Sequence, residues 1–234
     1  MVLARLALAS IAAALSVGSL PPASRAQDKP DFPALARSSG MPQIPGLHIV
    51  YLAPLGDPAA APWKNIILHQ TEGPAGSARG MARAQAKHPV RRGVTLWVET
   101  DGTVTWATPE SAITTHGDGG NRNDNKYVDN SKTYRRVTAA NSIGIEFVGN
   151  FPDVRTQPTA EQFAAGVALV RFLQERYGIP AERIYAHNWI DYKDARYCEG
   201  CALAEQARAL GYVPGRAEPV AASRVDTLTP AGRR

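Results

Sequence analysis

Short apolar runs alternate along the chain with longer segments of helical periodicity. Runs of four to seven mainly apolar residues, bounded by glycine, proline or polar residues, predict strands. These runs cover residues 65–68, 93–98, 103–107, 142–148 and 183–187. Helix-like segments cover residues 77–88, 159–177 and 202–210. Strands interleaved with helices predict a single α/β domain with a central mixed sheet flanked by helices.

The longest helical segment carries clear start and stop signals. Thr159 and Gln162 have the spacing of a capping box, and Gly178 and Pro180 are typical of a helix end. Its predicted apolar face consists of Phe163, Val167, Val170 and Leu173. Asp101-Gly102, between two predicted strands, favours a tight hairpin turn. The segment 116–134 is rich in Gly, Asn and Asp and predicts a loop.

Residues 1–26 have the pattern of an export signal. Arg5 precedes an apolar stretch at 6–17, and Ser24-Arg25-Ala26 offers small residues at positions −3 and −1 of a cleavage site. A membrane anchor is the alternative, but the apolar stretch is shorter than the about 20 residues a span needs. We therefore expect cleavage, a mature chain without a transmembrane segment, and a periplasmic or secreted protein.

The rest of the chain divides by composition into three parts. Residues 27–62 form a Pro- and Gly-rich arm in which the apolar run 47–52 predicts one short strand. The regular pattern of strands and helices occupies residues 63–212. Residues 213–234 are small and polar, and we expect a disordered tail there.

Composition and charge narrow the classes of partner. The chain is 44% hydrophobic and 20% charged, with a formal net charge of +5. Removal of Arg5 and Arg25 with the signal leaves +3, which is too mild to indicate a nucleic-acid partner. It is compatible with an anionic polymer such as a cell wall. Two cysteines exclude a disulfide-rich scaffold.

Three residues with metal-binding side chains lie at predicted strand ends or in the loops beyond them. His69 and His187 each end a strand, and Cys198 follows His187 by eleven residues. Two imidazoles and one thiolate, with an open fourth position, are the ligands of catalytic zinc. A single histidine at a strand end is more often structural, however. The stretch Cys198-Glu199-Gly200-Cys201 alone is also typical of a local disulfide in an exported protein.

Several short motifs, in order along residues 63–212, resemble those of the type 2 N-acetylmuramoyl-L-alanine amidases. That family is related to peptidoglycan recognition proteins and phage-type amidases. The motifs are Asn65-Ile66-Ile67-Leu68-His69-Gln70-Thr71, Asp101-Gly102-Thr103-Val104, Thr115-His116-Gly117, Asn141-Ser142-Ile143-Gly144-Ile145-Glu146, Ala186-His187 and Cys198-Glu199-Gly200. The resemblance implies the amidase/peptidoglycan-recognition fold and a zinc enzyme. It also implies hydrolysis of the amide between the muramic acid lactyl group and L-alanine, with peptidoglycan or muropeptide fragments as partners.

The resemblance also assigns the three zinc ligands. It implies His69 and His187 as nitrogen ligands and Cys198 as the third, because Cys198-Glu199-Gly200 stands where the family has Cys-Pro-Gly or Asp-Pro-Gly. Asp194 and Asp191 are the alternatives for the third position. A disulfide between Cys198 and Cys201 would remove the thiolate, although it would close a very small loop.

Three further residues receive roles from the same comparison. Glu146, at the end of an apolar strand, is the expected general base and later acid. Arg196 lies two residues before Cys198, where the family often has Lys or Thr, and is expected to stabilise the oxyanion. His116 is expected to bind substrate in the cleft. Val94 stands where the family often has tyrosine, which leaves the base role to Glu146.

Two other functions compete with the amidase hypothesis. One is a catalytically silent peptidoglycan-binding protein on the same fold, and the other is a zinc peptidase acting on stem peptides. Silent relatives lose metal ligands, most often the cysteine, whereas this sequence keeps His69, His187, Cys198 and Glu146. That difference favours the amidase.

Overall fold

The computed structural model describes residues 41, 44–87, 93–117, 130–149, 157–191 and 199–209. The chain divides into two units, and every described residue lies in the second, Phe32–Arg234. The predicted signal at 1–26 and the predicted tail at 213–234 lie outside the described residues and stay predictions.

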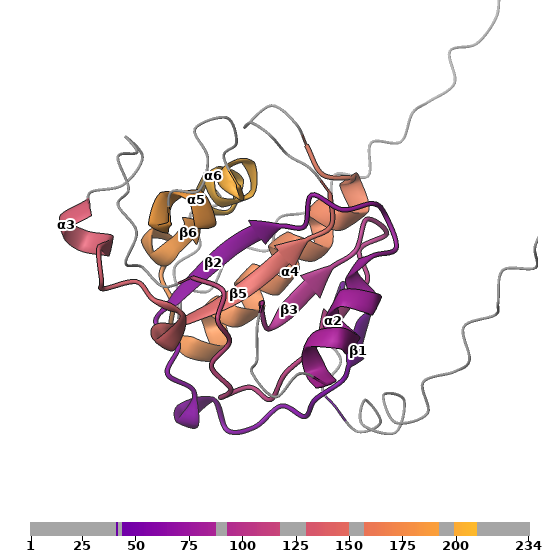
Figure 1. Cartoon of the computed structure of the whole chain (residues 1–234), viewed down its shortest axis with the longest axis horizontal. Coiled ribbons are helices and arrows are strands. Elements are labelled where there is room, and N and C mark those ends of the chain that lie inside the picture. The colour runs from indigo at the N-terminus through magenta and orange to yellow at the C-terminus, as the bar shows by residue number, and fades with distance from the viewer. Residues whose placement is uncertain are drawn as a thin grey trace, which may run out of the picture. The chain divides into compact units, whose positions relative to one another are not determined.

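The described part of the chain is built on one six-stranded mixed sheet, as the sequence predicts (Figure 1). Its order is β1-β4-β3-β5-β2-β6. Only the β3–β4 pair is antiparallel among the pairs described. The strands are β1 (Ile49–Tyr51), β2 (Asn65–Gln70), β3 (Leu96–Val98), β4 (Val104–Trp106), β5 (Ser142–Phe147) and β6 (Ile184–Ala186). The helices are α2 (Ala78–Lys87), α3 (Asn130–Thr133), α4 (Ala160–Tyr177), α5 (His187–Ile190) and α6 (Cys201–Ala209), with short 3-10 turns at Pro58–Ala60, Ala139–Asn141 and Ala181–Arg183.

Local sequence accounts for the middle of the sheet. β2 is buried along its whole length and β5 nearly so, as expected for strands with a parallel neighbour on each side. Gly102 has φ +81°, which the turn between β3 and β4 requires. The short strand predicted within 47–52 is observed as β1, and its Tyr51 is fully buried in the core.

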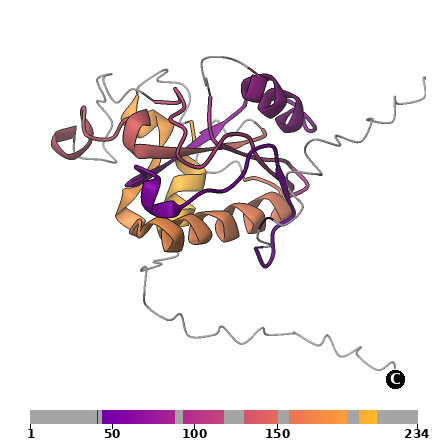
Figure 2. The same ribbon diagram turned by 90° about the horizontal axis from the view of Figure 1, so that it is seen from below.

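One face of the sheet is covered by the long helix α4 (Figure 2). Thr159 caps the helix by accepting the Gln162 backbone N–H at 3.1 Å, and Gly178 ends it in the left-handed conformation. The predicted capping box is only half formed. The Gln162 side chain instead donates to the carbonyls of Val98, the last residue of β3, and Val148, the residue after β5, and so attaches the helix to the sheet.

The buried stripe of α4 is also rotated from the prediction. Val170 and Leu173 are buried as expected, whereas Phe163 and Val167 are only half-buried. Ala165, Gly166 and Leu169 take the central positions instead. Small residues lie here because the Phe147 ring would be only 2.6 Å from a Cβ added at Gly166. Packing against β5, rather than apolar periodicity alone, therefore sets this face.

The other face of the sheet leaves room for a site. Helix α2 packs on β3 and β4, while α5 and α6 flank β6 (Figure 1). Residues 130–133, within a predicted loop, form the short helix α3, and His187 begins α5 rather than ending β6. Among the described helices, none is both long and apolar enough to cross a bilayer.

Candidate metal centre

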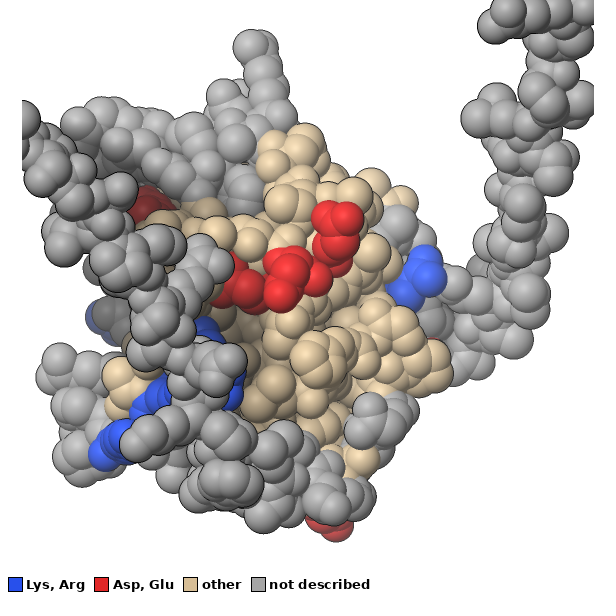
Figure 3. Space-filling model, turned by 90° about the vertical axis from the view of Figure 1, so that its right-hand side faces the viewer, with Lys and Arg blue, Asp and Glu red and all other residues tan. Residues whose placement is uncertain are grey.

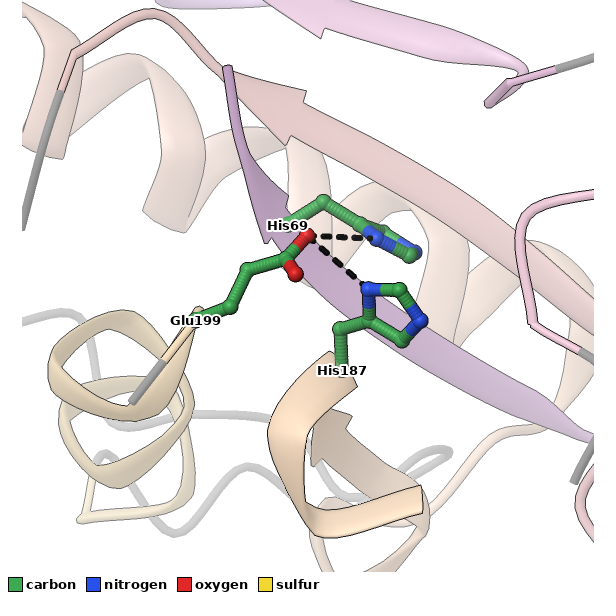
Figure 4. A group of neighbouring side chains, drawn as sticks. All are labelled: His69, His187 and Glu199. Atoms are coloured by element: carbon green, nitrogen blue, oxygen red, sulfur yellow. Dashed lines mark hydrogen bonds and ion pairs between the residues drawn. The ribbon is translucent and has the colours of Figure 1, made fainter. Parts of the chain in front are cut away.

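Three side chains with atoms that can bind a metal, those of His69, His187 and Glu199, lie together near the carboxyl ends of β2 and β6 (Figure 4). One carboxylate oxygen of Glu199, Oε1, lies 3.3 Å from His69 Nδ1 and 2.9 Å from His187 Nδ1. The ligand atoms of the three residues all lie within 4.8 Å of one another. Both histidines are buried and Glu199 is partly buried. Two imidazole nitrogens and one carboxylate oxygen are a donor set found in catalytic zinc sites.

The sheet register brings the two histidines together. β2 and β6 are parallel neighbours in which Leu68 pairs with Ala186, so the next residues, His69 and His187, leave adjacent strands at the same level. Their ring centroids are 4.3 Å apart. Equivalent ends of parallel strands meet at one edge of a sheet, so the register alone brings together two histidines that are 118 positions apart in the sequence.

Gly200 brings the carboxylate to the two histidines. Its φ is +80°, and a Cβ added there would lie 2.0 Å from the carbonyl oxygen of Leu68 and 3.4 Å from Ala186 Cα. Only glycine permits so close an approach of the loop to β2 and β6. Glu199 is thereby placed beside the residues that follow Leu68 and Ala186, which are the two histidines.

The electrostatics of this cluster favour a bound cation. Burial and the proximity of His187 lower the pKa of His69 to about 3, so its imidazole is neutral near pH 7. Burial raises the pKa of Glu199, but its contacts with His187 and His69 outweigh that effect and hold the pKa well below the usual range. Imidazole nitrogens and an ionised carboxylate are also the donor groups that zinc prefers, so the three residues could hold such an ion in place of the protons they share.

His116 lies directly behind His69. Its Nδ1 is 3.1 Å from His69 Nε2, and its Nε2 donates to the Ser142 carbonyl at 3.0 Å. The side chain is buried, and burial lowers its pKa to about 4. Although His116 lines the cleft, both of its ring nitrogens contact groups within the protein. Its predicted role in substrate binding stays a prediction.

Glu146 lies on the same side of the sheet as His69. The two residues are register partners on the parallel strands β5 and β2, and register partners point to the same face. Glu146 is half-buried and lines a cleft of about 770 Å³ together with His69, His187 and Glu199. That volume suits a ligand of several sugar or peptide units. The carboxylate predicted as general base therefore shares a cleft with the candidate metal ligands.

Of the residues predicted as third ligand, only Asp191 is among the described residues, and it lies apart from Glu199. Asp191 is buried, but its Oδ2 lies 3.6 Å from His187 Nε2, on the opposite side of that ring from Glu199. Asp194, Arg196 and Cys198 lie outside the described residues. Cys201 begins α6, is fully buried and is disulfide-bonded.

Sequence reasoning missed Glu199 as a member of the cluster. Its signal was present in the unusual motif Cys198-Glu199-Gly200, where a carboxylate replaces the proline of the family pattern. The conformation of Gly200, which determines where Glu199 points, is not readable from a three-residue motif.

The described residues on one face of the molecule carry mixed charge rather than a uniformly basic one. On the face shown in Figure 3, acidic side chains form one band with lysine and arginine groups toward its edges. The described residues on this face form no broad positive surface of the kind that binds a nucleic-acid backbone.

Comparison of the sequence with models of known protein families gives one match. The model of the N-acetylmuramoyl-L-alanine amidase family matches residues 59–201, which contain β2 to β6, His69, His187 and Glu199. The chain belongs to the N-acetylmuramoyl-L-alanine amidase family. The resemblance inferred from the short motifs is thus confirmed. No curated protein sequence matches significantly.

Solved structures similar to this family member include bacterial and animal proteins. The N-acetylmuramoyl-L-alanine amidase LysC from Clostridium intestinale is 20% identical, with a TM-score of 0.47 over 69% of this chain and 95% of its own. An AmpD derivative is 17% identical, with a TM-score of 0.46 over 71% and 96%. A mutant of Drosophila PGRP-LB in complex with tracheal cytotoxin is 18% identical, with a TM-score of 0.41 over 59% and 79%.

Proposed function

We propose that this protein is a zinc-dependent N-acetylmuramoyl-L-alanine amidase. Its reaction is hydrolysis of the amide between the lactyl group of muramic acid and L-alanine in peptidoglycan or its fragments. The observation that carries the proposal is the convergence of His69, His187 and Glu199 beside Glu146 in one cleft. A cluster of metal-binding side chains next to a further carboxylate is the arrangement that metal-assisted hydrolysis uses.

In this proposal His69, His187 and the Glu199 carboxylate would hold the zinc ion. This assignment replaces Cys198 by its neighbour Glu199. The sequence has two cysteines, so Cys198 is the one partner within the chain for a disulfide at Cys201. A disulfide sulfur is not a thiolate ligand, whereas the Glu199 carboxylate already contacts both histidines.

Zinc supplies a polarised carbonyl and a water of lowered pKa when it is bound. Glu146 supplies the proton transfers. It accepts a proton from the attacking water and later delivers it to the alanine nitrogen as the C–N bond breaks. The carboxylate is suited to this exchange because it lies on the face of His69 and is only half-buried. Arg196 stays the predicted source of positive charge for the oxyanion.

The decisive test is product analysis with purified cell-wall sacculi and with soluble muropeptides. We expect peptides with a free N-terminal L-alanine and glycan with a free lactyl carboxylate. Activity should disappear on chelation and return with zinc. Glu146→Gln should keep one zinc per chain and lose about 10²–10⁴-fold in rate.

Other products would overturn the proposal. Cleavage within the stem peptide would show a peptidase, and retention of sacculi without any cleavage by the zinc-loaded chain would show a binding protein. Loss of zinc in Glu146→Gln would remove Glu146 from the role of base.

We further propose that the protein acts outside the cytoplasm. The support is the pattern at residues 1–26. Expression of the full sequence in a bacterial host, followed by N-terminal sequencing of the exported form, should give a mature chain beginning at Gln27. An intact N-terminus in the cytoplasmic fraction would contradict export.

A further inference from the structure

We propose that a basic rim beside the cleft recognises free carboxylates on the peptide part of the substrate. The basic rim consists of four exposed residues of one short segment, Lys132, Tyr134, Arg135 and Arg136. It contains none of the candidate metal ligands or catalytic residues. The inference rests on the proposed function for the identity of the substrate. Its consequence is a preference for acidic stem peptides over amidated ones.

The basic rim concentrates positive charge on the surface. Residues 132–136 read Lys-Thr-Tyr-Arg-Arg, with three cations and no acid. All three cations are exposed, and none of them forms an ion pair among the described residues. The short helix α3, which contains Lys132, lies at the outer margin of the described chain in Figures 1 and 2. The charges are therefore presented to solvent.

Local contacts hold the two arginines in a defined arrangement. Arg135 has φ +54°, a left-handed conformation that is uncommon for a residue with a Cβ. Its guanidinium carbon lies 5.2 Å from the centre of the Tyr134 ring, which is a cation–π contact. The carbonyl of Arg136 accepts the Asn141 side-chain amide at 2.7 Å. This arrangement lowers the entropy that the arginines would lose on binding a ligand.

The basic rim adjoins the cleft through the residues that follow it. Ala139 donates its backbone N–H to the Gly117 carbonyl at 2.6 Å, and both residues line the cleft. Val137, between the rim and Ala139, is fully buried in the core and fixes the segment to the domain. Arg136 lies three residues before Ala139, so their Cα atoms are at most about 11 Å apart. The rim therefore borders the part of the cleft that Gly117 and Ala139 form.

The distance from Glu146 to this part of the cleft suits a short peptide. Ser142, where β5 begins, precedes Glu146 by four residues, which is about 13 Å along a strand. Four residues of an extended peptide cover the same distance. When the scissile amide lies at Glu146, later residues of the stem peptide can reach the rim. The glycan side offers no such charge, because the lactyl carboxyl group is part of the amide.

The cleft itself does not attract an acidic peptide through its own side chains. The described lining residues include the acids Glu72, Glu146, Asp191 and Glu199 but no lysine or arginine. These carboxylates repel a negatively charged substrate. Cations at the edge of the cleft offset that repulsion and steer carboxylates toward it. The rim is therefore the part of the described site that can select for free carboxylates.

The test compares two forms of one muramoyl tripeptide whose peptide begins with L-alanine and D-glutamate. One form has free carboxylates and the other has carboxamides. NMR titration of the metal-free and the zinc-loaded chain measures Kd for each form, and kcat/KM measures hydrolysis. We expect the acidic form to bind about 5–10-fold more tightly, as two exposed charge pairs allow. The preference should shrink in about 0.5 M salt, which screens exposed charges.

Substitutions in the basic rim should remove the preference. Arg135→Gln with Arg136→Gln should bring the two Kd values together, whereas the corresponding double lysine variant keeps the charge and should retain most of the difference. Arg171→Gln is the control, because α4 covers the face of the sheet opposite the cleft. It removes one cation and should leave the preference unchanged. If the double glutamine variant folds poorly, Arg136→Gln alone should still reduce the preference.

Two results would overturn the inference. One is equal affinity of the unsubstituted chain for the acidic and the amidated form. The other is a preference that persists in the folded double glutamine variant. A chain that prefers the acidic form but hydrolyses neither would refute the proposed function and keep the rim. Hydrolysis of both forms with equal Kd and equal kcat/KM would keep the amidase and refute the rim.

Discussion

The carboxylates of Glu110 and Glu199 have opposite surroundings. Glu110 is almost inaccessible, and each of its oxygens accepts hydrogen bonds from donors. Glu199 is partly buried and directs Oε1 at the Nδ1 atoms of two histidines. The charge of Glu110 is neutralised by Arg176, and its oxygens are satisfied by donors from the protein. The Glu199 site brings together the side chains that the proposed function assigns to zinc.

The donors around Glu110 show what a structural carboxylate looks like here. Arg176 binds both oxygens, Tyr177 donates its hydroxyl at 2.5 Å, and the Gly56 N–H donates at 2.7 Å. Burial raises the pKa of Glu110, but these donors outweigh burial and the net shift is downward. The network joins α4 to the segments before β2 and after β4. Its function is therefore to hold the fold together, whereas Glu199 contacts only side chains of the candidate metal centre in the interactions described above.

Substitution of Glu199 should give the largest effect on the metal centre. Glu199→Gln should weaken zinc binding by more than about 100-fold, which is beyond the effect of an outer-shell group, and abolish hydrolysis. Metal-free Glu199→Gln should lose less stability than Glu110→Gln, because the side chain is more exposed and the amide keeps a hydrogen bond to an imidazole. Chelator competition and thermal unfolding without metal measure the two quantities. A less stable apo protein with unchanged zinc affinity would reverse the roles assigned to the two carboxylates.

Substitution of Glu110 should show the converse pattern. Glu110→Gln leaves the Arg176 charge without its partner and should lower the free energy of unfolding by about 3 kcal/mol. Zinc affinity should be unchanged, because the network lies away from the three ligands. Glu175→Gln, at an exposed position on the same helix, is the control and should alter neither stability nor zinc binding. Denaturant unfolding measures the stability and zinc titration measures the affinity. Unchanged stability in Glu110→Gln, or weaker zinc binding, would contradict the structural role of Glu110.

Gly200→Ala should affect both stability and the metal centre. The new Cβ would collide with the Leu68 carbonyl, and alanine disfavours a φ of +80°. We expect a loss of about 2 kcal/mol in unfolding free energy, together with weaker zinc binding as Glu199 moves from the histidines. Gly76→Ala shares the positive φ but meets nothing within 4 Å, so it isolates the backbone strain. Equal zinc affinity in the two variants would show that Gly200 does not position Glu199.

The pH dependence of stability should give the smallest effect. The folded-state pKa of Glu110 is below the ordinary value of 4.5, so its stabilisation is complete above about pH 4.5. It is lost as pH falls through the lower folded-state pKa. The stability difference between the unsubstituted chain and Glu110→Gln should therefore shrink in acid. A difference that stays constant down to pH 2 would show that the carboxylate charge contributes nothing.

Most of the sheet could be predicted from the sequence because its strands are apolar runs with clear boundaries. The positions of β2 and β5 follow from their apolar runs, and that of α4 follows from its periodicity and from the end signals at Thr159 and Gly178. The rotated stripe of α4 could not be predicted, since it depends on where the Phe147 ring packs against Gly166. The short helices α3 and α5 are too brief to give a periodic signal.

The site divides in the same way. His69, His187 and Glu146 lie at the ends of predictable strands, and parallel register brings them together. Glu199 depends on the positive φ of Gly200 and on its contact with Leu68. The contact between His116 and His69 depends on a space left at Gly144 by a different strand. Contacts of this kind, between residues far apart in the sequence, leave no local sequence pattern.

X-ray absorption spectroscopy at the zinc edge tests the central claim most directly. The protein should be loaded with one equivalent of zinc without a reductant. The account predicts a first shell of nitrogen and oxygen alone, at about 2.0–2.2 Å, with the outer-shell signature of two imidazoles. A sulfur scatterer at about 2.3 Å would contradict it, because Cys198 rather than Glu199 would then complete the site.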